Sequence, residues 1–132
     1  RSNNSWMHNV PVLVSGRERC TLLVHPADAE RTGVRAGERA RITSTAGSIE
    51  APVELSEDMA PGVVSLPHGW GHDRAGARLG VAGATPGVSA NDVTDEGFVD
   101  QLSGNGGLNG LVVVVERLTA SAVVDPRPVA GA

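Results

Sequence analysis

The chain has 132 residues, a formal net charge of −4 and a single cysteine. A chain of this length forms one domain and buries about two-thirds of its unfolded surface around one core. All eleven basic residues are scattered arginines, so the sequence carries no nucleic-acid-binding patch. Cys20 alone cannot build a disulfide framework or an all-cysteine metal site. No apolar run approaches the roughly 20 residues that a membrane-spanning helix requires, so we expect no membrane insertion.

The first two predicted elements are short strands. Residues 10–14 and 20–24 are β-rich runs separated by a turn-prone segment, and the two strands can pair with each other. The chain begins at Arg1 without an initiator methionine, and we expect it to be part of a longer protein.

The next stretch, PADAERTG, predicts one short helix. Pro26 suits a first helical turn and Gly33 suits a stop. Asp28 and Glu30 suit the positive end of the helix dipole, and both are expected on a solvated face. His25 precedes the helix, and we expect it to fix the turn from strand to helix.

Antiparallel strands are predicted after the helix. Residues 39–44 alternate apolar or small with polar side chains, and a second alternating run follows a tight turn at Ala46 and Gly47. An alternation with a period of two is typical of half-buried antiparallel strands. A further strand is expected at residues 63–66, after a Pro-Gly turn.

The second half of the chain is dominated by a long irregular segment. Residues 67–109 are rich in glycine and polar side chains, which in so small a domain indicates a functional loop. Residues 111–115, LVVVV, predict a strand covered on both faces and central to a closed sheet. Six to seven strands in total favour a small closed β-barrel over residues 1–118. The tail at residues 119–132 is predicted to be disordered.

Two polar and aromatic motifs, SNNSWMHN and PHGWGH, are candidate binding loops. The histidine spacing in PHGWGH would suit a helix, but two interior glycines cost a helix about 2 kcal/mol relative to alanine, so a loop is favoured. In a loop, glycine lets the backbone approach a ligand and tryptophan offers a stacking surface. Asparagine, serine and neutral histidine add directional hydrogen bonds.

Other interpretations of these residues remain open. His68 and His72 could ligate a metal if a third group such as His8, His25 or Asp73 came close. They could also satisfy backbone groups only, and the tryptophans could fill the core. Cys20 is predicted to be a small buried core residue in a strand away from the motifs, and not a metal ligand.

The sequence resembles the C-terminal domain of the molybdopterin oxidoreductases, which include formate dehydrogenases, nitrate reductases and dimethyl sulfoxide reductase. The resemblance extends over residues 1–118 and is carried, in order, by RSNNSWMHN, HPADAERTGVRAGERARITSTAGSIEAPVEL, GVVSLPHGWGH, PGVSANDVTD and LNGLVVVV. Within the group, the chain is most similar to formate dehydrogenases and assimilatory nitrate reductases.

The resemblance implies an all-β (mainly β) fold: a double-psi β-barrel of about six strands with one or two short helices and long loops. Such a domain clamps bis(molybdopterin guanine dinucleotide), while other domains hold the molybdenum or tungsten and an iron-sulfur cluster. Partners are therefore the remaining domains of a parent oxidoreductase, and the isolated domain should have no redox activity. We expect a cytoplasmic location. The alternative is a stand-alone barrel that serves as a binding or interaction module without molybdenum.

The resemblance also assigns cofactor contact to residues in the matched motifs. No catalytic residue and no metal ligand is assigned to this chain. The expected cofactor-binding residues are Asn3, Asn4, Ser5, Trp6, Met7, His8, His68, Gly69, Trp70, Gly71, His72, Asn91 and Asn109.

Overall fold

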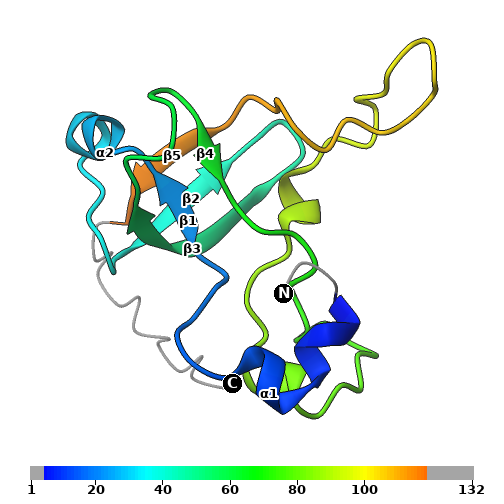
Figure 1. Ribbon diagram of the computed structural model, residues 1–132. Helices are drawn as coiled ribbons and strands as arrows, with labels where there is room; N and C mark the ends of the chain where they lie inside the picture. The colour runs from blue at the N-terminus through cyan, green and yellow to red at the C-terminus, as the bar shows by residue number, and fades with distance from the viewer. Residues whose placement is uncertain (1–4, 119–132) are drawn as a thin grey trace, which may run out of the picture.

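The computed structural model describes residues 5–118. Its strands form one five-stranded sheet that curls into a half-barrel (Figure 1). The strand order is β4-β1-β3-β2-β5; β1 and β3 are parallel, and the other neighbouring pairs are antiparallel. The mainly-β, barrel-like architecture is thus confirmed, with five strands in the described part of the chain where about six were expected. The strands are β1 (Leu22–Val24), β2 (Arg39–Thr43), β3 (Ser48–Leu55), β4 (Val64–Ser65) and β5 (Val114–Arg117).

The helix α2 forms as predicted. The His25 ring accepts a hydrogen bond from the Ala27 N–H at 3.1 Å, which caps the N-terminus of the helix. Gly33 ends it with a φ of 74°, a left-handed conformation in which glycine avoids the steric cost of a Cβ. The helical segments are η1 (Ser5–Asn9), α1 (Pro11–Val14), α2 (Pro26–Thr32), η2 (Ala82–Ala84) and η3 (Ala90–Val93).

Asp28 is less solvated than the sequence suggested. Its side chain is buried, and its carboxylate accepts hydrogen bonds from Arg31 at 2.7 Å and from the Gly62 N–H at 2.6 Å. The expected solvated position is therefore wrong for Asp28, although Glu30 is exposed as predicted. Asp28 ties α2 to the turn before β4.

The hairpin of β2 and β3 supplies much of the core, as its alternation predicted. Ile42 pairs with Ile49 and Ala40 with Ala51 across the two strands, and all four side chains are buried. The intervening charged side chains face outwards. Apolar burial on one face of the hairpin fixes its register, because a slip of one residue would expose that whole set.

The predicted strand at residues 10–14 is wrong. These residues form the single turn α1, which begins at Pro11, and Val12 is exposed. Proline has no N–H for a sheet and its fixed φ suits a first helical turn. The segment therefore does not pair with β1, and β1 instead lies between β3 and β4.

The central strand predicted at residues 111–115 is also wrong. In the described chain β5 pairs only with β2, so it is an edge strand, and residues 111–113 precede it as irregular chain. Val112 is 89% exposed and Val114 is 57% exposed. The apolar run without alternation therefore did not indicate a strand buried on both faces, because the described part of the chain leaves several of its valines exposed.

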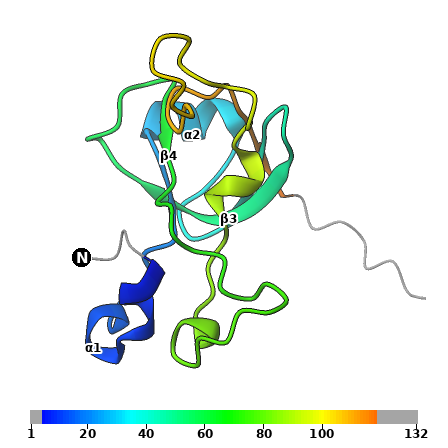
Figure 2. The same cartoon turned by 90° about the vertical axis from the view of Figure 1, so that its right-hand side faces the viewer.

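Two parts of the chain extend from opposite ends of the half-barrel (Figures 1 and 2). At one end lie η1, α1 and the segment that carries η2, and at the other a loop over residues 95–107 projects away. The long segment at residues 67–109 contains only short 3-10 turns and a bridge between Val99 and Gly106. Within the described range, none of the helices has the length and apolarity needed to cross a membrane. The tail predicted to be disordered lies outside the described residues.

Candidate functional site

The structure brings the two predicted binding motifs together through three rings. His8 comes from η1, and Trp70 and His72 come from the glycine-rich loop that follows β4. The rings of His8 and Trp70 stack with centroids 3.8 Å apart and an interplanar angle of 24°. His8 Nδ1 lies 2.8 Å from His72 Nε2, which is hydrogen-bond distance. We call His8, Trp70 and His72 the ring cluster.

The two histidines of the ring cluster are buried. His8 is 1% exposed and His72 is 8% exposed. Burial lowers the pKa of His72 below its usual value, and the neighbouring His8 lowers it further, while Asp73 opposes both. A short bond between two ring nitrogens requires one to donate and the other to accept. In the His8–His72 pair, one ring therefore presents an N–H to a lone pair of the other, and burial favours the neutral form of His72.

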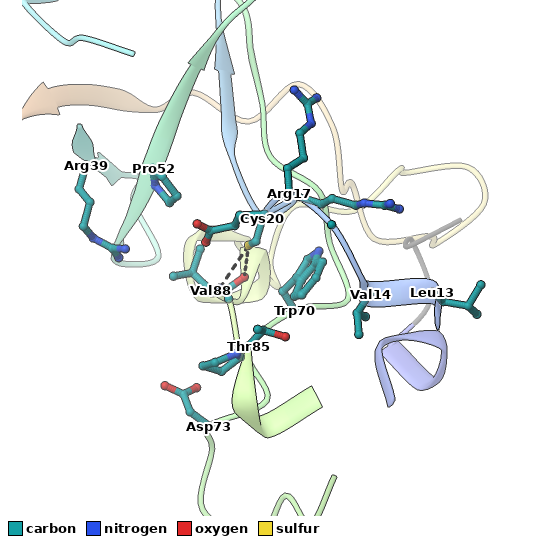
Figure 3. Close-up of a pocket in the computed structure, with 15 residues that line it drawn as sticks. Leu13, Val14, Arg17, Cys20, Arg39, Pro52, Trp70, Asp73, Thr85 and Val88 are labelled. Carbon is teal, nitrogen blue, oxygen red and sulfur yellow. Dashed lines mark hydrogen bonds between the residues drawn. The ribbon is translucent and has the colours of Figure 1, made fainter. Parts of the chain in front are cut away.

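The indole of Trp70 has a donor that no group in residues 5–118 accepts. Its Nε1–H is buried and has no hydrogen-bond partner among the described residues. Buried polar groups are nearly always satisfied, so an unsatisfied one marks a place where a further group can bind. Trp70 also lines a pocket of about 650 Å³ (Figure 3). The indole thus connects the ring cluster to a cavity of the size that small-molecule ligands occupy.

The loop that carries Trp70 is held by its own backbone. The N–H groups of Gly71 and His72 both donate to the Pro86 carbonyl, at 2.8 and 3.2 Å. A Cβ on Gly71 would lie 2.7 Å from the Ser89 Cβ, and the Gly71 φ is +100°. Glycine is needed at this position because the chain packs against itself. The expected contact of Gly71 with a ligand stays a prediction.

Asn9 belongs to the motif SNNSWMHN, but sequence reasoning assigned it no role. Its Oδ1 accepts hydrogen bonds from the Val81 N–H at 3.0 Å and the Ala82 N–H at 3.2 Å. These bonds fasten η1 to the start of η2, next to the residue that supplies the His8 ring. The sequence offered one signal for this role, namely that Asn9 is the last residue of the polar motif SNNSWMHN.

Cys20 is buried, as predicted, but it is not distant from the motifs. A Cβ on Gly87 would lie 2.9 Å from both Cys20 Sγ and Trp70 Cε3, so all three meet at one point. The Val88 N–H donates to Cys20 Sγ at 3.3 Å. Burial raises the pKa of the Cys20 thiol, which keeps it protonated and unreactive. Cys20 and Trp70 thus pack around Gly87.

The other predicted contact residues do not join the ring cluster. Trp6 is 64% exposed, and Ser5 and Met7 lie beside it in η1. Asn91 and Asn109 are exposed and border two separate hollows that do not include Trp70. His68 is exposed, and Gly69 between it and Trp70 has a φ of 89°. Asn3 and Asn4 lie outside the described residues.

In the part of the chain that the structure describes, a metal site at the histidines lacks a third ligand. Among residues 5–118, no three histidine, cysteine, aspartate or glutamate side chains are grouped so that they could hold a metal ion. His25 is used as a helix cap, and its ring nitrogen already accepts a hydrogen bond. The arrangement instead suits an organic ligand with heterocyclic edges and hydrogen-bonding groups.

In this barrel-like domain, two motifs distant in sequence meet as a buried ring cluster beside a pocket. These features are typical of a ligand-binding β domain. Over residues 1–112 the chain matches the family described as the molydopterin dinucleotide binding domain. This match covers most of the chain, and the chain belongs to that family of molybdopterin dinucleotide-binding domains.

Individual relatives support the same family. The chain is 29% identical to a tetrathionate reductase polypeptide of Salmonella typhimurium over 112 residues, which cover 72% of this chain and 11% of that protein. It is 28% identical to the molybdopterin-containing polypeptide of the arsenate respiratory reductase of Chrysiogenes arsenatis, over 85% of this chain and 14% of that protein. Acetylene hydratase from Pelobacter acetylenicus shares the fold with a TM-score of 0.70 at 22% identity, over 87% of this chain and 16% of that chain.

Proposed function

We propose that this chain is the cofactor-binding domain of a larger molybdopterin-dependent oxidoreductase, and that its ring cluster contacts bis(molybdopterin guanine dinucleotide). The family membership supports the cofactor class. The first two relatives belong to reductases, and this chain spans only 11% and 14% of their length. Both facts support a parent enzyme with further domains, and we propose that those domains hold the metal.

The observation that carries the proposal is the ring cluster, whose Trp70 donor has no acceptor within residues 5–118. The Trp70 Nε1–H needs an acceptor, and carbonyl and phosphate oxygens of a pterin dinucleotide are acceptors. Burial favours the neutral form of the neighbouring His72, so its ring places no charge next to the ligand. The residues present therefore fit the group that the family binds.

The role of this chain in catalysis is positioning. The bound molybdenum cofactor supplies the oxidation and reduction chemistry. The stacking of His8 on Trp70 limits the rotation of both rings, and the bond to His72 holds the two histidine rings against each other. Rigid contact residues hold a ligand in one position, and a reaction at the other end of the ligand requires that position to be accurate.

Finer assignments remain predictions. The expected similarity to formate dehydrogenases and assimilatory nitrate reductases, the cytoplasmic location and the individual contact residues each await a direct test. The length of the open reading frame distinguishes the stand-alone binding module from the enzyme domain. An open reading frame that extends several hundred residues upstream, with a cluster-binding cysteine motif near its start, supports the enzyme domain.

The test is Trp70→Phe in the full-length protein. Phenylalanine keeps a ring stacked on His8 but removes the Nε1–H donor. Loss of a hydrogen bond to a charged acceptor weakens binding by roughly 1.5–3 kcal/mol, so we expect molybdenum and pterin content per protein to fall about tenfold or more under dilution.

The control is Cys20→Ala, which loosens the packing beside Trp70 and removes the weak thiol bond to the Val88 carbonyl but keeps the indole N–H. We expect this variant to retain its molybdenum. Equal cofactor retention in wild type and Trp70→Phe would refute the proposed contact, and equal losses in Trp70→Phe and Cys20→Ala would reduce it to a packing effect.

A further inference from the structure

The loop over residues 95–107 is built as a self-supporting projection, which we call the finger. The Asp100 N–H donates to the Asn105 carbonyl at 2.8 Å, and the Gly107 N–H donates to the Phe98 carbonyl at 2.7 Å. These bonds flank the bridge between Val99 and Gly106, so the finger is a small hairpin. Figures 1 and 2 show it extending from the end of the half-barrel opposite α1.

The tip of the finger is closed by one carboxylate. Asp100 Oδ1 accepts hydrogen bonds from the Leu102 N–H at 3.1 Å and the Ser103 N–H at 2.7 Å. The Gly104 N–H donates to the Asp100 carbonyl at 2.8 Å. These bonds hold the backbone of the tip in one shape and direct the Leu102 side chain outwards.

The side chains of the finger are unusual for a solvated turn. Leu102 at the tip is 99% exposed, and Phe98 and Val99 at its base are exposed as well. The turn between β2 and β3 in the same molecule carries Ser44, Thr45, Ala46 and Gly47, which are small or polar. A projecting element that is ordered by its own hydrogen bonds and ends in an exposed leucine has the features of a docking element.

The charge of the finger indicates the chemistry of its receptor. Residues 95–107 contain three carboxylates, Asp95, Glu96 and Asp100, and no basic residue. A complementary receptor has an apolar pocket for the leucine and a basic rim for the carboxylates.

The small size of the finger favours a receptor on the same polypeptide. The finger spans residues 95–107, whereas a stable interface between separate proteins takes about 20–30 residues a side. A small contact suffices when both partners belong to one chain, because the effective concentration is then high. The family match over residues 1–112 includes the finger, and this chain spans 11% and 14% of the named relatives.

We propose that the finger docks through Leu102 into a basic-rimmed apolar pocket on another domain of the same polypeptide. This proposal rests on the proposed function, because it requires a parent enzyme with further domains. It adds an interaction surface at the end of the half-barrel opposite η1, which supplies the His8 ring.

Hydrogen exchange of the finger amides tests the proposal. We expect the amides of residues 95–107 to exchange at least about tenfold more slowly in the full-length protein than in the 132-residue chain. Leu102→Asp in the full-length protein should remove this protection. Because the Leu102 side chain is almost fully exposed, this variant leaves the fold of the half-barrel intact.

The matched control is Gln101→Asp, which adds the same charge at the neighbouring exposed position and should keep the protection. Equal exchange in the two proteins, or protection that survives Leu102→Asp, would overturn the proposal. Protection that rises with protein concentration would overturn it in favour of a second copy. Molybdenum content, measured in the same samples, reports on the proposed function separately, because it depends on the cofactor and not on the finger.

Discussion

Gly87→Ala tests the packing behind Trp70. Gly87 has a φ of +61°, and an added Cβ would lie 2.9 Å from Trp70 Cε3, 2.9 Å from Cys20 Sγ and 3.0 Å from Cys20 Cβ. Two of these atoms belong to a buried cysteine that cannot turn away without leaving the core. The substitution must therefore displace the indole or the strand entry at Cys20.

The expected cost has two parts. A left-handed conformation costs a residue with a Cβ about 1–2 kcal/mol. Forcing an extra methyl into a packed site costs about 1–3 kcal/mol. We therefore expect Gly87→Ala to lower the free energy of unfolding of the chain by about 2–5 kcal/mol.

Gly33→Ala separates the two parts. Gly33 has a φ of +74°, and nothing lies within 4 Å of a Cβ added there. This variant should lose only the backbone contribution, about 1–2 kcal/mol. Urea denaturation gives both free energies, and the indole N–H resonance of Trp70 should shift in Gly87→Ala only. Equal costs at the two glycines, with an unmoved Trp70 resonance, would refute the packing argument.

Four further predictions concern the site and its supports. Asn9→Leu should cost roughly 1–3 kcal/mol by leaving two N–H groups without an acceptor, whereas Asn9→Asp keeps an acceptor and should lose far less in the same urea assay. Asp28→Ala should cost roughly 1.5–3 kcal/mol through the lost bonds to Gly62 and Arg31, and Glu30→Ala should stay within about 0.5 kcal/mol; comparable costs would contradict the buried role of Asp28. Because folding lowers the pKa of His72, the unfolded chain binds a proton at a higher pH than the folded chain, so the free energy of unfolding should be highest above about pH 6.5 and fall as the pH drops through the folded pKa. His72→Gln should flatten this pH dependence in urea titrations. An unchanged slope would exclude His72 as its source. An NMR titration with GDP should shift the resonances of His8, Trp70 and His72, and shifts confined to distant residues would place nucleotide binding elsewhere.

Local patterns in the sequence determined the elements whose stability is local. The helix α2 followed from its proline, its acidic first turn and its terminal glycine, and each of these acts within one turn of the backbone. The hairpin of β2 and β3 followed from alternation, because one buried face imposes a period of two. The two binding motifs were visible because polar and aromatic residues clustered in segments rich in asparagine or glycine.

Apolar runs without a local cue were interpreted wrongly. Residues 10–14 and 111–115 are both valine-rich, and each was predicted to form a strand inside the sheet. The first became the helical turn α1 and the second led into an edge strand with exposed valines. Which neighbour covers an apolar run depends on topology, and valine content alone does not contain that information.

By itself, the sequence determined a small mainly-β domain, one capped helix and two candidate binding motifs, because backbone propensity and side-chain periodicity act over a few residues. Only the tertiary structure decided that His8 meets Trp70 and His72, although His8 and His72 are 64 residues apart in the sequence. It also decided that Cys20 and Gly87 pack against the indole of Trp70. Such contacts depend on how the chain closes long loops, and many arrangements of the same segments satisfy the local preferences equally well. The hydrogen bonds of Asn9 and Asp28 to distant N–H groups arise in the same way, since a side chain finds a distant partner only after the fold has placed both.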